Sequence, residues 1–207
     1  SFSLSSFNIS VFFSIRIYSY APFSYLFFGK DRALLFGTGA NPDDKDDKLD
    51  IRKYVDEVIA GWLAENGRDT IDLVVGHLHN HYDHHEGDGQ FVNREDTVLI
   101  QPNLHEVKKF FKFENWPKAN VAFDLGGRSL TLIPIPGHTD DSIAVYDPAT
   151  QFLLTGDSFY PGELFFEDWK SYQQSIDKLV TFAETKPISH ILGTHIEITK
   201  TPGEEYG

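Results

Sequence analysis

Six consecutive residues constrain this chain more than any other feature of its sequence. They read His79-Asn80-His81-Tyr82-Asp83-His84, and they place three imidazoles and a carboxylate at the spacing His-x-His-x-Asp-His. A short rigid turn with that spacing can direct all four groups into one small volume, and zinc and related cations favour this mixture of nitrogen and oxygen donors. The apolar run 71–75 just before the motif predicts a buried strand, so we expect a metal site in the loop beyond its end.

Three further candidate ligands follow other apolar runs that predict strands. They are His138, Asp157 and His195. Loops just beyond strand ends can turn side chains into one cleft, because the sheet fixes the backbone beneath them. His79 and His81 are two residues apart, so on an extended chain both face the same side. Asp83 and His84 are adjacent, so we expect their side chains to diverge and to serve a second centre.

The register of the motif is unambiguous. A start at His77 would require Asp at position 81 and His at position 82, and these positions hold His81 and Tyr82. Glycines at 87 and 89, and Pro136-Gly137 before His138, indicate tight turns next to the candidate ligands. The remaining histidines are interpreted as exposed residues or as neighbours of the ligands. They are His77, His85, His105 and His190.

The order of predicted elements is strands first, then alternating strands and helices. Apolar alternation predicts strands, and helical spacing of apolar residues predicts helices. The predicted strands are 11–18, 23–28, 33–36, 71–75, 97–100, 129–135, 142–146, 152–155 and 188–192, and the predicted helices are 51–66, 104–111 and 169–183. The polar stretch 41–50 is interpreted as a solvated connection with Asp50 near a helix start. The pattern fits two sheets packed face to face with helices outside, and without a repeat or linker we expect a single domain over residues 1–207.

Composition excludes several classes of partner. The net charge of −13 argues against nucleic acid, because no basic stripe could neutralise phosphates. No run approaches the ~20 apolar residues of a membrane span, so we expect a soluble chain and a small-molecule substrate. The absence of Cys rules out thiolate ligands and removes any indication of the redox compartment, so an exported and a cytoplasmic location both stay open. Oligomeric state is not indicated. The missing initiator Met suggests a trimmed product.

Taken together, the motifs resemble the metallo-β-lactamase superfamily of metal-dependent hydrolases. The resemblance implies an α/β protein of the α+β class, with the four-layer αββα sandwich and the site at one edge of the sheets. It implies two zinc ions, with iron or manganese as substitutes. The first ion would be held by His79, His81 and His138, the second by Asp83, His84 and His195, and Asp157 would bridge them.

The same resemblance implies a binuclear zinc-dependent hydrolase in which a metal-bridging hydroxide cleaves a small-molecule ester, thioester, lactone or amide, β-lactams included. Asp83 would also orient the nucleophile, and Tyr160, in the aromatic loop after Asp157, could donate a hydrogen bond to the developing oxyanion. Two alternatives stay open. One is a persulfide-dioxygenase-type oxidoreductase with a single iron at His79, His138 and Asp157; the other is a metal-binding module with weak or no catalysis.

Two departures from the superfamily pattern stand out. The third strand of relatives usually ends in Asp-Thr-Gly, whereas this chain reads Phe36-Gly37-Thr38-Gly39, so Gly37 replaces an acid near the site. Loss of such a supporting group typically lowers metal affinity or activity about 10–100-fold. The chain also continues only twelve residues past His195, so we expect a C-terminal segment to be missing or trimmed.

Overall fold

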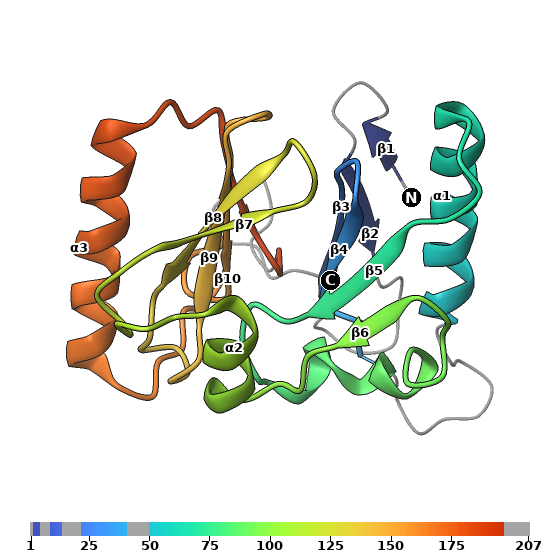
Figure 1. The fold of residues 1–207 in the computed structure, drawn as a ribbon. Helices are drawn as coiled ribbons and strands as arrows, with labels where there is room; N and C mark the ends of the chain where they lie inside the picture. The colour runs from blue at the N-terminus through green and yellow to red at the C-terminus, as the bar shows by residue number, and fades with distance from the viewer. Residues whose placement is uncertain (1, 5–8, 14–21, 41–49, 197–207) are drawn as a thin grey trace.

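Two β-sheets pack face to face between outer helices in the computed structural model, which describes residues 2–4, 9–13, 22–40 and 50–196. Figure 1 shows α1 (Ile51–Asn66) outside one sheet and α3 (Trp169–Thr185) outside the other, with α2 (Leu104–Phe111) below them. This arrangement confirms the predicted αββα sandwich. None of the described helices is both long and apolar enough to cross a lipid bilayer.

The first sheet has the order β1-β2-β3-β4-β5-β6. Its strands are β1 (Phe2–Leu4), β2 (Ile9–Phe13), β3 (Phe23–Phe28), β4 (Arg32–Phe36), β5 (Asp72–Gly76) and β6 (Thr97–Leu99). Strands β1 to β4 pair antiparallel as a meander, whereas β4, β5 and β6 are parallel. Parallel neighbours need a long crossover, and α1 provides the one between β4 and β5.

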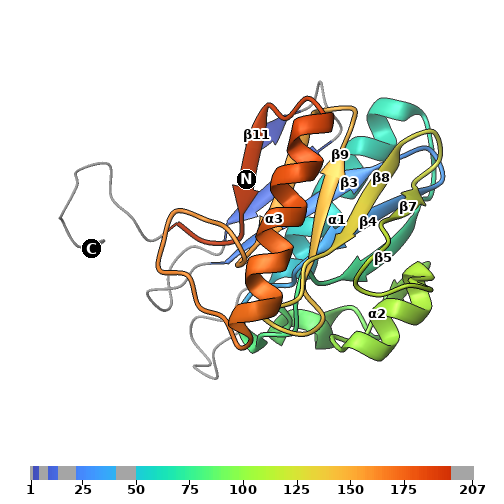
Figure 2. The same cartoon turned by 90° about the vertical axis from the view of Figure 1, so that its left-hand side faces the viewer.

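The second sheet has the order β11-β10-β9-β8-β7. Its strands are β7 (Val121–Asp124), β8 (Ser129–Pro134), β9 (Ile143–Asp147), β10 (Phe152–Gly156) and β11 (His190–Gly193). Strands β7 to β10 are antiparallel, and α3 connects β10 to its parallel neighbour β11. Figure 2 shows α3 across the face of this sheet with β11 at its edge.

Strands β3, β4, β5, β9 and β10 are buried on both faces along most of their length, because apolar residues fill successive positions. In β3, Tyr25 and Phe27 face the core between the sheets, whereas Leu26 and Phe28 pack beneath α1. In the second sheet, Leu132 and Val145 join the central core, and their neighbours pack beneath α3. Continuous apolar runs of this kind are typical of sheets covered on both sides.

The predicted elements are confirmed to within a few residues at their ends. Asp50 caps α1 by accepting a hydrogen bond from the Lys53 backbone N–H at 3.1 Å, and Gly67 ends the helix with φ of 62°. The sequence did not predict strand β1, strand β7 or the two short 3₁₀ helices, η1 (Tyr82–His84) and η2 (Glu86–Gln90). Residues 14–18 of the first predicted strand and loop residues 41–49 lie outside the described residues.

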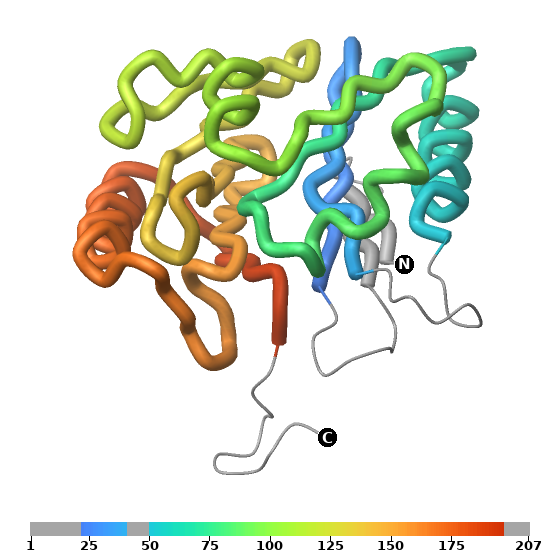
Figure 3. The backbone as a smooth tube through the Cα atoms, turned by 90° about the horizontal axis from the view of Figure 1, so that it is seen from below, coloured from blue at the N-terminus to red at the C-terminus, as the bar shows by residue number. Residues whose placement is uncertain are grey.

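The fold brings several strand ends to one edge of the sandwich. The loops after β5, β8, β10 and β11 carry all seven candidate ligands. Figure 3, a view from below, shows the green loop after β5 and the red chain near residue 195 on this edge. Candidate ligands that are up to 116 residues apart in sequence, His79 and His195, are therefore neighbours in space.

Candidate metal centre

The seven candidate ligands gather into two adjacent groups. Among the described residues, one ligand atom from each member of a group lies within 4.8 Å of the others. The first group is His79, His81, His138 and Asp157, and the second is Asp83, His84 and His195. The ring nitrogens of His138 and His81 are 3.0 Å apart, and those of His195 and His84 are 3.3 Å apart. The sequence-based grouping therefore agrees with the geometry of the side chains.

Asp157 lies at the centre of both groups. Its Oδ2 atom is 3.3 Å from the Nε2 atoms of His84 and His195. The same oxygen is 3.6 Å from His79 Nε2 and 3.8 Å from His138 Nε2. The Thr194 hydroxyl donates a hydrogen bond to the other carboxylate oxygen, Oδ1. One oxygen thus faces ligands of both groups, which is the position that a bridging carboxylate requires.

One expectation about the motif is wrong. Asp83 and His84 do not diverge: Oδ2 of Asp83 lies 3.5 Å from His84 Nε2 and 3.4 Å from His195 Nε2. The expectation assumed an extended backbone, whereas both residues lie in the 3₁₀ helix η1. With 3.0 residues per turn, neighbouring side chains are about 120° apart, and the long imidazole reaches the carboxylate beside it.

The histidines and carboxylates shift each other's titration. Burial would raise the pKa of Asp157, but His84 and the hydrogen bond with His195 outweigh it and hold that pKa well below its usual range. Burial would lower the pKa of His195, but Asp157 and Asp83 raise it to about 9. Burial, reinforced by His84, lowers the pKa of His79 well below its usual range. The cluster therefore combines ionised carboxylates with imidazoles close enough to share a cation.

The donor atoms present fit bound cations. His79 Nε2 is buried, makes no hydrogen bond to any described residue, and faces the Asp157 carboxylate. A buried nitrogen without a hydrogen bond is costly unless it has another partner. Imidazole and carboxylate donors without thiolates suit zinc, iron or manganese. Each of the two ligand groups can therefore accept one divalent ion.

His138 is oriented by the loop after β10. Its Nδ1–H donates to the Phe165 carbonyl oxygen at 2.8 Å, which leaves Nε2 to face the first group. The preceding Gly137 has φ of 140°, and a Cβ there would lie 2.4 Å from the Tyr172 backbone. Only glycine fits this approach, which confirms the tight turn expected at Pro136-Gly137.

The other histidines divide as expected into exposed residues and neighbours of the ligands. His105 and His190 are exposed, and His85 contacts the Asn80 carbonyl oxygen through Nε2 at 3.2 Å. His77 is buried beside the motif. The Tyr160 hydroxyl donates to the Glu163 carbonyl oxygen at 2.6 Å, and the Tyr160 ring lies 5.7 Å from the His195 ring.

A family model described as the metallo-beta-lactamase superfamily matches residues 19–195. The chain belongs to the metallo-β-lactamase superfamily. Among solved structures, a metallo-beta-lactamase from Pontibacter korlensis is 19% identical with a TM-score of 0.62, and the match covers 94% of this chain and 89% of that one. The metallo-beta-lactamase IND-7 is 18% identical with a TM-score of 0.59, covering 95% and 89%. These likenesses confirm the metallo-β-lactamase fold.

The curated relatives of this superfamily member are matched over only part of their length. The hydroxyacylglutathione hydrolase of Bdellovibrio bacteriovorus is 24% identical over 181 residues, which are 86% of this chain and 65% of that protein. The human acyl-coenzyme A thioesterase MBLAC2 is 38% identical over 58 residues, which are 28% of this chain and 20% of that protein. The chain thus spans less than two thirds of the first relative and about a fifth of the second.

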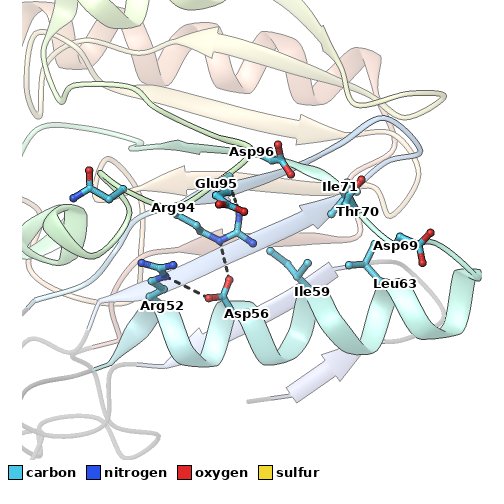
Figure 4. A pocket seen from close by; sticks show the side chains of 11 residues that line it. Arg52, Asp56, Ile59, Leu63, Asp69, Thr70, Ile71, Arg94, Glu95 and Asp96 are labelled. Carbon is cyan, nitrogen blue, oxygen red and sulfur yellow. Dashed lines mark hydrogen bonds and ion pairs between the residues drawn. The ribbon is translucent and has the colours of Figure 1, made fainter.

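A surface hollow of about 410 Å³ lies away from the ligand groups, between α1 and residues 93–96. Figure 4 shows its charged side chains, with Arg94 Nε 2.8 Å from Asp56 Oδ1 and Arg52 Nε 3.4 Å from Asp56 Oδ2. None of the seven candidate ligands lines this hollow. Both of its arginines pair with Asp56, and no histidine lines it, so it lacks the ligand set of the metal centre.

Proposed function

We propose that this protein is a metal-dependent hydrolase that cleaves a small-molecule ester, thioester, lactone or amide at a centre of two cations. The observation that carries the proposal is the pair of ligand groups joined at one oxygen of Asp157. The proposed ligands are His79, His81 and His138 for one cation and Asp83, His84 and His195 for the other, with zinc as the first choice. When bound, such cations supply Lewis acidity that polarises a carbonyl and activates water near neutral pH.

The chain's own residues would provide orientation and charge. Burial would raise the pKa of Asp83, but the hydrogen bond with His195 and the charge of His84 keep it below the ordinary value. Asp83 is therefore ionised at neutral pH and can accept a hydrogen bond from water, which aims the water at the carbonyl. No protein nucleophile is needed in this scheme.

Thioesters are the first substrates to test. The two curated relatives are a hydroxyacylglutathione hydrolase and an acyl-coenzyme A thioesterase. A further structural neighbour, AiiA of B. thuringiensis, has N-decanoyl-L-homoserine bound at its active site; it is 17% identical with a TM-score of 0.54, over 86% of this chain and 82% of that one. These relatives favour acylated small molecules over nucleic acids as substrates, in line with the acidic net charge of −13.

Elemental analysis of the purified protein, with assays on a substrate panel, tests the proposal. We expect two zinc ions per chain and turnover of at least one thioester, ester, lactone, β-lactam or other amide. One iron per chain would instead support the persulfide-dioxygenase type of oxidoreductase. Full metal loading without turnover across the panel, phosphodiesters included, would support a metal-binding module.

Tyr160 is proposed as a donor to the developing oxyanion. Its ring lies beside His195. Its hydroxyl, which donates a hydrogen bond to the Glu163 carbonyl oxygen, would donate to the substrate oxygen instead. We expect Tyr160→Phe to lower kcat about tenfold or more, since removal of a single oxyanion donor can cost about 100-fold, and to leave metal content unchanged. Steady-state kinetics with elemental analysis measures both; an unchanged kcat would remove this role.

The aromatic loop after β10, together with Trp169 at the start of α3, is proposed to contact the acyl part of the substrate. Phe165, Phe166 and Trp169 are 54%, 44% and 53% exposed, and Phe166 and Trp169 stack on Tyr172 near the His138 turn. We expect Trp169→Ala to lower kcat/KM for a decanoyl thioester by roughly tenfold while changing the acetyl thioester little, because only a long chain reaches an apolar surface. Val180→Ala, which removes an exposed apolar side chain further along α3, is the control. Equal loss for both chain lengths would contradict the assignment.

A further inference from the structure

Three residues outside the ligand set surround the backbone of His84. They are Thr38, the second residue after β4, His77, directly after β5, and Asp88, in η2. The Thr38 backbone N–H donates to the His84 carbonyl oxygen at 2.8 Å, and His77 Nδ1 lies 3.2 Å from the same oxygen. A carbonyl oxygen can only accept, so Nδ1 is the donor in this contact. The backbone of one candidate ligand is thus held by two groups from two different strand ends.

Asp88 contacts both of these donors. Its Oδ1 atom accepts a hydrogen bond from the Thr38 hydroxyl at 2.9 Å, and its Oδ2 atom lies 3.2 Å from His77 Nε2, a close contact that is not a hydrogen bond. Thr38 and His77 are buried, so the carboxylate acts where water competes little. The contacts form a closed path from Asp88 through Thr38 and His77 to the His84 carbonyl.

Backbone segments pack closely on one side of this path. A Cβ at Gly87 would lie 2.5 Å from the Thr38 carbonyl oxygen, so η2 contacts the segment after β4 at backbone distance. Gly39 and His85 form an isolated bridge alongside. Gly37 has no side chain to offer here, although a Cβ at that position would lie 3.7 Å from the His84 carbonyl oxygen.

We propose that Asp88 is a positioning residue for His84, acting through Thr38 and His77, and that it takes over the supporting role left open at Gly37. The second group of ligands depends on it because Asp83 and His84 share the turn η1. The first group is supported independently, since Phe165 orients His138 and the Ile143 N–H donates to the Leu78 carbonyl oxygen at 2.8 Å. Loss of Asp88 should therefore weaken one cation site and spare the other.

This inference rests on the proposed two-cation centre, and metal binding tests it without any assay of turnover. Metal-free wild type, Asp88→Asn, Thr38→Val and Thr38→Ser are titrated with zinc against a chelator of known affinity. We expect wild type to bind two ions. In Asp88→Asn and Thr38→Val, one of the two ions should bind about 10–100-fold more weakly than in wild type, which is the usual cost of losing such support. The other ion should bind as in wild type. Thr38→Ser, which keeps the hydroxyl, should bind both ions normally.

Asp72→Asn, an exposed substitution at the opposite end of β5, is the matched control and should bind like wild type. Equal binding of both ions by wild type and Thr38→Val would overturn the inference, as would equal weakening of both sites in the folded variants. If Asp88→Asn fails to fold by circular dichroism, the comparison of Thr38→Val with Thr38→Ser decides. Binding of fewer than two ions by wild type would instead overturn the proposed two-cation centre.

Discussion

Replacement of Asp83 or His84 by alanine is expected to remove nearly all hydrolysis and to leave the fold intact. Both side chains belong to the second ligand group, and Asp83 is also proposed to orient the attacking water. Loss of a group that merely supports a ligand costs about 10–100-fold, so loss of a ligand itself should lower kcat/KM by more than about 100-fold. The panel substrate with the highest turnover provides the assay, and elemental analysis should show about half the metal content.

His105→Ala is the matched control for these variants. The His105 side chain is 81% exposed on α2, outside both ligand groups, so its removal should change neither rate nor metal content. Circular dichroism and thermal unfolding of the metal-free proteins verify the fold. A folded Asp83→Ala variant with the wild-type rate would refute the proposed centre, whereas loss of the fold would show that η1 has a structural role instead.

The sequence was sufficient to predict which side chains meet. Each candidate ligand follows an apolar run that predicts a strand, so a shared site at the strand ends was expected from the sequence pattern, whereas the division into two groups came from the resemblance to the superfamily. The pairing of His79 with His81 likewise followed from the two-residue period of extended chain. These inferences succeeded because they depend on the backbone pattern, which a local sequence encodes.

Features that depend on tertiary contacts were not predictable in this way. The convergence of Asp83 with His84 depends on a 3₁₀ turn, and strand β7 is short with alternating exposure. The contact of Asp88 with Thr38 joins residues 50 positions apart, and no role was assigned to either residue from the sequence. The sequence marked His77 only as a neighbour of the ligands, because nothing local indicates that its ring faces Asp88 and the His84 carbonyl.

Loss of one buried ion pair is expected to lower the stability of the fold strongly. Arg128 and Asp147 form a buried ion pair, with side chains 8% and 0% exposed. Arg128 Nη2 is 2.6 Å from Oδ2 of Asp147 and Nε is 3.2 Å from Oδ1, while Nη1 donates to the Phe28 carbonyl oxygen at 3.1 Å. The pair therefore connects the second sheet to β3 of the first.

Arg128→Met should lower the free energy of unfolding by about 3–5 kcal/mol, because it leaves the Asp147 carboxylate buried without its counter-charge. Urea denaturation of the metal-free protein measures this change. Arg52→Met is the matched control: Arg52 pairs with Asp56 on the surface, where both side chains are 41% exposed. A surface pair of this kind contributes less than about 1 kcal/mol, so similar losses in the two variants would contradict the importance assigned to the buried pair.

The pH dependence of stability gives an independent measure of the same pair. Burial would raise the pKa of Asp147, but hydrogen bonds from Arg128 and Thr150 outweigh it and hold the pKa below its ordinary value of 3.8. A carboxyl with a lowered folded-state pKa stabilises the fold above its unfolded-state pKa, and this contribution is lost as pH falls through the folded-state value. The difference in unfolding free energy between wild type and Asp147→Asn should therefore be constant from about pH 7 to pH 5 and narrow below about pH 4. A difference that stays constant down to about pH 2.5 would show that ionisation of Asp147 does not stabilise the fold, because both states would then titrate alike.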